Sequence, residues 1–194
     1  MEQYSYDKYF AKKKFWKLFG GEIKIYDEEK KNLLFFVKQK AFKLKEDITV
    51  YSDESMIKEV LKINARSIID FSAAYDVMDV LTNEKLGTLR RRGFKSILRD
   101  SWEILDSSDN VIGSVVEDSM GMALLRRFLT NLIPQKFQLL VNESLVGYLK
   151  QTFNPFVPQF SIDFSMDVEK KLDRRMGIAT VVLLQLIEGR QSSY

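Results

Sequence analysis

The chain has 194 residues, of which 45% are hydrophobic and 29% are charged, and its formal net charge is +3. This is enough for one large β domain or two small domains, and the charge balance lacks the strongly basic character of a nucleic-acid-binding domain. Because the sequence contains no Cys and no His, it excludes disulfides, thiolate or imidazole catalysis and the commonest zinc ligands.

The N-terminal part of the chain predicts a first strand. Tyr9–Phe19 mixes lysines with aromatic residues, and the aromatic side chains are expected to pack in the core. An alternative is a membrane interface into which Phe15, Trp16 and Phe19 would dip. Met1–Tyr4 lacks a basic region followed by an apolar run, so we expect a cytoplasmic location, with peripheral attachment to a membrane left open.

Short alternating or apolar runs follow at regular spacing. They predict strands around residues 22–26, 33–45, 48–51, 60–69 and 75–80, with polar turns between them. Many short strands with regular turns favour a sandwich or a barrel.

Three later segments, Asp79–Arg91, Trp102–Glu117 and Phe137–Gln151, share one pattern: an apolar strand, a polar turn, then an apolar strand containing a glycine. A glycine within a strand marks a bulge or a close backbone approach. Its recurrence in successive hairpins suggests that the strands bend there to curl around another element. The alternative is that ordinary hairpins resemble one another.

Two further stretches lie outside this pattern. Ser119–Ile133 has apolar residues at helical spacing and predicts a short extra helix near 120–132, ended by Pro134. Phe156–Phe164 follows Pro155 and contains Pro158, which predicts an edge strand or a crossing strand.

The C-terminal segment Met176–Ile187 is apolar on every face except at Thr180 and Gln185. A helix of this kind must be enclosed, and it is well short of the ~20 residues that span a bilayer. We therefore expect a helix wrapped by protein, capped by Asp173 and ended by Gly189. Thr180 and Gln185 are expected to be hydrogen-bonded in the core or to face a barrel end.

The order of these parts resembles the tubby-like superfamily, specifically its phospholipid-scramblase and LURP-one-related branch. The resemblance runs from about Tyr9 to Gly189, and it is carried by Lys13–Gly20, Tyr75–Val80, Asn83–Arg92 with Trp102–Leu105, and Phe164–Glu169 leading into the terminal helix.

That resemblance implies a mainly β fold, a closed antiparallel barrel of about twelve strands around one buried C-terminal helix. The sequence has no low-complexity linker and no shift in composition, so we expect a single domain over residues 9–190, with 1–8 and 191–194 as tails. Scramblases carry an acidic calcium-binding segment before the helix, but Asn154–Asp167 offers only Asp163 and Asp167. A calcium site needs 6–8 oxygen ligands, so we expect no metal and no cofactor.

A basic cluster is the best candidate for a binding site. Arg suits phosphate oxygens, and alternation along a strand places Arg90 and Arg92 on one face. Lys12–Lys14 are candidates for the same surface. The residues predicted to bind an anionic headgroup are Arg90, Arg92, Lys95, Arg99, Arg126 and Arg127. The alternative is a solvated edge at which basic residues deter strand pairing.

These observations favour a non-catalytic module that docks on anionic phospholipid headgroups. The main alternative is a scaffold for an unknown protein partner, which includes a second copy of the chain. A scramblase is a further alternative, and it would require the terminal helix to leave the barrel. No catalytic constellation was found, and Asp106–Asn110 predicts a hairpin turn because it lacks the spacing and central Gly of a calcium loop.

Overall fold

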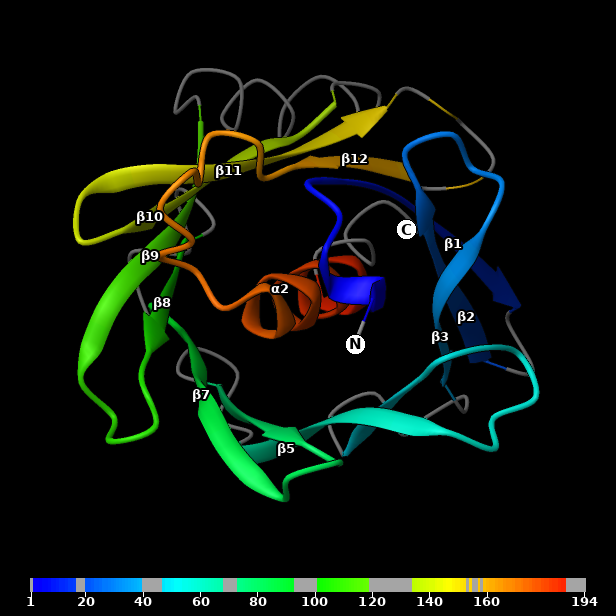
Figure 1. Cartoon of the computed structure of the whole chain (residues 1–194), viewed down its shortest axis with the longest axis horizontal. Coiled ribbons are helices and arrows are strands. Elements are labelled where there is room, and N and C mark those ends of the chain that lie inside the picture. Colours follow the sequence, from blue (N-terminus) through cyan, green and yellow to red (C-terminus); the bar gives the residue numbers. More distant parts are fainter. Residues whose placement is uncertain are drawn as a thin grey trace.

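The computed structural model describes residues 2–16, 20–39, 47–67, 73–92, 101–118, 134–152, 154, 157 and 159–187. These residues form a closed antiparallel barrel with one α-helix along its interior (Figure 1). The elements are η1 (Glu2–Tyr4), β1 (Lys8–Trp16), β2 (Gly20–Asp27), β3 (Leu33–Gln39), β4 (Ile48–Tyr51), β5 (Glu59–Ser67), β6 (Ala74–Asp79), β7 (Glu84–Arg91), β8 (Ser101–Leu105), β9 (Val111–Glu117), β10 (Lys136–Val141), β11 (Ser144–Thr152), β12 (Gln159–Asp163) and α2 (Arg174–Ile187).

Each strand pairs with its neighbours in the sequence, and β1 pairs with β12 to close the ring. The predicted mainly β barrel is therefore confirmed. The prediction of an edge or crossing strand near 156–164 is wrong, because β12 pairs with both β1 and β11. Pro155 and Pro158 both precede the first residue of β12, so neither removes a donor from its ladder. The predicted extra helix near 120–132 lies outside the described residues.

The terminal helix is enclosed as expected. From Met176 to Leu186, no side chain is more than 3% exposed. The helix packs against inward-facing residues of the barrel wall to form one hydrophobic core. Asp173 caps its start, since the Asp173 carboxylate accepts a hydrogen bond from the Arg175 N–H at 2.9 Å. Gly189 lies outside the described residues.

The two polar residues of the helix behave differently. The Thr180 hydroxyl donates to the Met176 carbonyl at 2.9 Å, as predicted for a hydrogen-bonded core residue. The Gln185 side chain is buried near the end of the helix, and its amide atoms have no hydrogen-bond partner among the described residues.

The predicted bends at the three glycines are confirmed. Gly87, Gly113 and Gly147 each stand beside a shift in strand register. A Cβ at Gly87 or Gly113 would meet a carbonyl oxygen of the neighbouring strand, and one at Gly147 would lie 2.7 Å from the Phe164 ring. Because glycine has no side chain, neighbouring parts of the barrel wall can approach closely at these positions, where the wall curls around α2.

The two ends of the barrel are defined by the direction of α2. At the helix-entry end, Arg175 of α2 pairs with Asp79 at the end of β6, with 2.7 Å between the charged atoms. At the helix-exit end, Lys13 of β1 donates from Nζ to the Gln185 carbonyl at 2.8 Å. The helix-entry end comprises residues 2–7 and the connections 28–32, 52–58, 80–83, 106–110, 142–143 and 164–173. The connections that leave and re-enter the barrel at the helix-exit end are 17–19, 40–47, 68–73, 92–100, 118–135 and 153–158.

Residues 2–7 cover part of the helix-entry end. The rings of Tyr4 and Phe35 lie 5.0 Å apart, and Tyr4 and Tyr6 pack against the core. Asp7 pairs with Arg174 of α2 at 3.2 Å. Figure 1 shows η1 beside the first turns of α2, on the same end of the barrel. Among the described residues, no helix combines the length and apolar character needed to cross a membrane.

Enclosure of α2 predicts a large difference between two identical substitutions. Leu183→Ala should lower the free energy of unfolding by about 2–5 kcal/mol, because it leaves a cavity at the centre of the barrel. Leu81→Ala, at a site 77% exposed, should change it by no more than about 0.5 kcal/mol. Urea unfolding of both variants tests this expectation. Equal losses would show that α2 is not enclosed.

Candidate functional site

Arg90 and Arg92 lie side by side on the outer surface near the helix-exit end. Leu89 points into the core, so alternation turns Arg90 outward, and Arg92 follows directly after β7 on the same face. Both guanidinium groups bind Glu103 of β8. Arg90 donates to Glu103 Oε2 from Nε at 2.8 Å and from Nη2 at 2.6 Å, and Arg92 Nε donates to Oε1 at 3.0 Å.

One carboxylate therefore lies against two cations. The side chains of Arg90 and Arg92 are 44% and 40% exposed, and that of Glu103 is 17% exposed. Partial burial raises the pKa of the Glu103 carboxyl, but the hydrogen bonds from Arg90 and Arg92 outweigh burial and lower it. The three side chains carry a net charge of +1, and the exposed guanidinium edges can meet an anion from solvent.

The other four residues of the predicted site, Lys95, Arg99, Arg126 and Arg127, lie outside the described residues. Their places in the chain are still informative. Lys95 and Arg99 belong to the connection between β7 and β8, and Arg126 and Arg127 belong to the connection between β9 and β10. Both connections leave from, and return to, the helix-exit end, where Arg90 and Arg92 lie.

Lys12–Lys14 do not all add to the basic surface. Lys13 points inward and is 3% exposed, and its ammonium binds the last turn of α2. A cation at this position is favourable because carbonyl groups at a helix C-terminus carry partial negative charge. Lys12 lies on the outside, 4.7 Å from the centre of the Tyr26 ring, and Lys14 is on the same face as Lys12. The prediction for Lys13 is therefore wrong.

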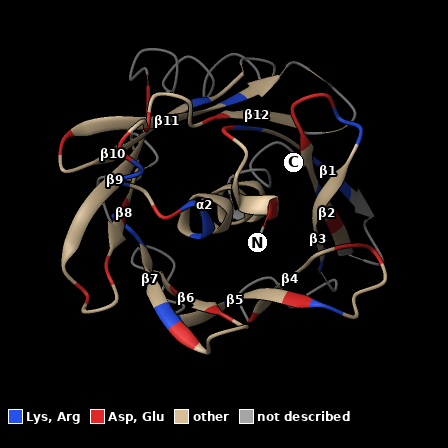
Figure 2. Cartoon of the chain, in the orientation of Figure 1, with Lys and Arg blue, Asp and Glu red and all other residues tan. Residues whose placement is uncertain are grey.

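The connections of the two ends differ in their content of charged residues. The six connections of the helix-exit end contain nine Lys and Arg and five Asp and Glu. The six connections of the helix-entry end contain five Lys and Arg and ten Asp and Glu. Acidic residues recur in the connections drawn toward the viewer in Figure 2. The helix-entry end is therefore acidic, and the connections of the helix-exit end are rich in Lys and Arg in the sequence.

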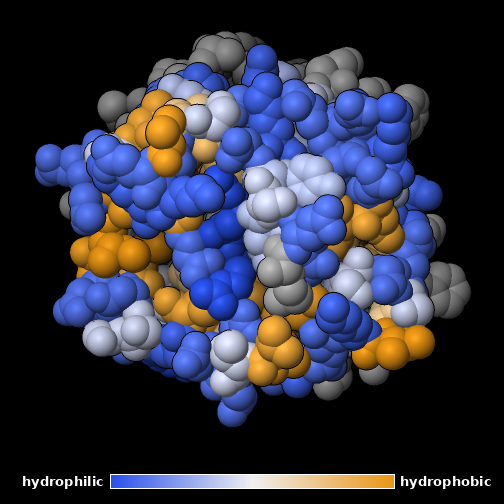
Figure 3. Space-filling model, viewed as in Figure 1, coloured by the Kyte–Doolittle hydropathy of each residue, from blue (hydrophilic) through white to orange (hydrophobic). Residues whose placement is uncertain are grey.

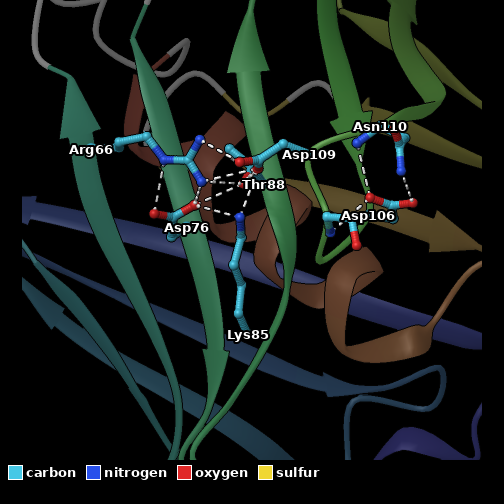
Figure 4. Close-up of polar contacts among 8 residues, drawn as sticks. Arg66, Asp76, Lys85, Thr88, Asp106, Asp109 and Asn110 are labelled. Carbon is cyan, nitrogen blue, oxygen red and sulfur yellow. Dashed lines mark hydrogen bonds and ion pairs between the residues drawn. The ribbon is translucent and has the colours of Figure 1, made fainter.

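A second ionic cluster, absent from the sequence-based site, joins β5, β6 and β7 to the turn between β8 and β9 (Figure 4). Arg66 donates to Asp76 Oδ2 at 3.0 Å and to both Asp109 oxygens at 3.0 Å. Lys85 binds Asp109 at 2.6 Å, and Thr88 donates to Asp76 at 2.7 Å. Alternation could have placed Arg66, Asp76 and Thr88 on the outer face. The register shift beside Gly87 turns Lys85 to the same face, and the strand order brings Asp109 to it.

The acidic residues considered as possible metal ligands stabilise turns. Asp106 accepts hydrogen bonds from the N–H groups of Ser108 and Asn110 at 2.9 Å, so the predicted hairpin turn is confirmed. Asp163 binds Ser165, and Asp167 binds the N–H groups of Lys171 and Leu172. Within the described part of the chain, no three acidic residues form a group that could hold a metal ion.

A closed β-barrel around a C-terminal helix, with charged surfaces outside a filled interior, is the architecture of a tubby-like domain. The family model for LURP-one-related proteins matches residues 33–185, and the chain belongs to this family within the tubby-like superfamily. The barrel of this family is typically a non-enzymatic binding domain. Searches of the curated proteins and of the solved structures found no match.

The ionic cluster predicts a pH-dependent loss of stability. Hydrogen bonds from Arg66 and Lys85 lower the pKa of the Asp109 carboxyl, so its stabilisation is fully present above the unfolded-state value of about 3.9 and is lost as the pH falls below it. Asp109→Asn should therefore be less stable than the parent at pH 7, and the difference should disappear in acid. Urea unfolding across this pH range measures it.

Glu143→Gln is the matched control, because Glu143 is an exposed turn carboxylate without an ion pair in the described ranges. It should leave the stability at pH 7 nearly unchanged. An Asp109→Asn variant as stable as the parent at pH 7 would show that the ion pairs of Asp109 contribute nothing to stability.

Proposed function

We propose that the protein is a non-catalytic binding module whose helix-exit end docks on anionic phospholipid headgroups at a membrane surface. The observation that carries the proposal is the pair of Arg90 and Arg92 on the outer face beside the helix-exit end, in a chain whose overall charge is nearly balanced. Arg90 and Arg92 mark this surface among the described residues. Lys95, Arg99, Arg126 and Arg127 belong to connections of the same end.

The enclosed helix favours binding on the outside of the barrel over binding within it. The inward-facing residues of the wall are packed against α2, so we expect exposed side chains to bind the ligand. Each basic residue near an anionic leaflet contributes about 1 kcal/mol, and several together give useful affinity without a deep pocket. This mode agrees with a cytoplasmic protein that associates with membranes peripherally.

The scramblase alternative receives less support. It requires α2 to leave the barrel and to expose side chains that are now buried in the core. The helix is also shorter, at 14 residues, than the ~20 that a bilayer demands.

Vesicle binding tests the proposal. The full chain should co-sediment with phosphatidylcholine vesicles that contain phosphatidylserine, but not with phosphatidylcholine alone, and less so as ionic strength rises from about 0.05 to 0.5 M. The triple variant Arg90→Gln, Arg92→Gln, Lys95→Gln should bind at least about tenfold more weakly, because it removes three cations from the docking surface.

A control variant removes the same charge from the acidic end. Lys30→Gln, Lys31→Gln, Lys58→Gln changes three exposed lysines of the helix-entry end and should bind like the parent. Equal losses in the two variants would mean that only net charge matters. Absence of binding at low salt would refute the proposal.

Glu103 predicts a gain of binding. Its carboxylate occupies the same guanidinium groups that a phosphate would contact, so it competes with the headgroup. Glu103→Gln keeps the size of the side chain and removes its charge, and it should strengthen binding to the anionic vesicles several-fold with a steeper dependence on salt. Unchanged or weaker binding of a folded Glu103→Gln variant would show that Arg90 and Arg92 do not contact lipid.

A further inference from the structure

The helix-entry end displays apolar side chains to solvent. Within the described ranges, the well-exposed large apolar residues all lie in or beside four of its connections: Met56, Ile57, Leu81, Val111 and Val168. Ile57, Val168 and Leu81 are 87%, 84% and 77% exposed. Single exposed apolar residues are common on protein surfaces, but these stand on turns of the same end of the barrel, beside acidic residues.

These apolar residues are held on fixed turns. Each of the four turns contains an aspartate whose carboxylate accepts hydrogen bonds from backbone N–H groups of the same turn. The bonds run to Asp53 from Ser55 at 2.8 Å, to Asp79 from Leu81 at 2.8 Å, to Asp106 from Ser108 at 2.9 Å, and to Asp167 from Lys171 at 2.8 Å.

Asp79 is held in turn by Arg175 of the buried helix. The apolar side chains are therefore presented by an ordered backbone, and a partner would lose little free energy to ordering these turns.

The same end carries the acidic excess of the molecule, with ten Asp and Glu and five Lys and Arg in its six connections. The two cations at the start of α2 are occupied, since Arg174 pairs with Asp7 and Arg175 pairs with Asp79 and Asp173. Figure 3 views this end and shows apolar areas separated by hydrophilic residues. An anionic membrane would be repelled by this surface, whereas a partner with basic and apolar groups would complement it.

We propose that the helix-entry end is a second interaction surface, which binds a protein segment bearing basic and apolar side chains, such as a cationic amphipathic helix. The apolar residues of the segment would contact Ile57, Leu81 and Val168, and its basic residues would face the acidic turns between them. This surface lies at the opposite end of the barrel from the proposed lipid site, so the two proposals can fail independently.

The test uses the full chain labelled with ¹⁵N and a synthetic amphipathic helix made of Leu and Lys. Titration should shift amide signals of residues 52–58, 80–83, 106–111 and 164–173, and binding should weaken at high salt. The triple variant Ile57→Ser, Leu81→Ser, Val168→Ser should bind at least about tenfold more weakly. Ile57→Val, Leu81→Met, Val168→Ile keeps the apolar character and should retain the affinity.

Several outcomes would overturn the proposal. One is equal binding of a peptide in which every Lys is replaced by Glu, and another is unchanged affinity of the triple serine variant. Shifts confined to other parts of the barrel would also contradict it. If these amides respond to protein concentration alone, the surface binds a second copy of the chain, and if they respond to phosphatidylcholine vesicles, it binds lipid.

Discussion

Burial of a helix that is apolar on every face is the constraint on which this structure depends. An ordinary amphipathic helix needs cover on one side only, whereas α2 exposes apolar groups all round and must be surrounded. A curled antiparallel sheet satisfies this need when its first and last strands join, because closure also pairs the edges that an open sheet would leave free. The glycines at 87, 113 and 147 allow the close backbone approach that accompanies the curvature.

Because the helix fills the interior, the outer wall and the two ends remain as surfaces for recognition. The described residues distinguish these ends: Arg90 and Arg92 lie near the helix-exit end, and acidic turns with exposed apolar residues form the helix-entry end. If both proposals hold, the protein links a membrane surface at one end to a cationic protein segment at the other. In this arrangement, the barrel acts as a rigid spacer whose length is set by its strands.

Much of the fold could be predicted from local sequence. The apolar run of α2, its Asp173 cap and the glycine-containing hairpins carry signals that lie within a few residues of one another. Contacts between distant strands could not be predicted in this way. Pairing of Arg90 and Arg92 with Glu103 depends on the register of β7 and β8, and the inward position of Lys13 depends on which face of β1 meets the helix.

The division of charge was also hidden from the sequence. Acidic and basic residues are interspersed along the chain, so no long segment is strongly charged. They separate only when antiparallel strands send successive connections to opposite ends. The prediction for Phe156–Phe164 failed for a related reason, since proline content alone does not reveal that β1 supplies a second partner for β12.

The seam between β1 and β12 has a consequence for how the chain matures. Lys8 is opposite Asp163 in this ladder, and α2 follows β12, so the wall cannot close and the interior cannot fill until the final fifth of the chain has been synthesised. Until then the apolar inner faces of the earlier strands are not packed against α2. Such long-range closure slows folding and prolongs the exposure of apolar surface in intermediates, so the earlier strands depend on the last segment of the chain for protection from aggregation.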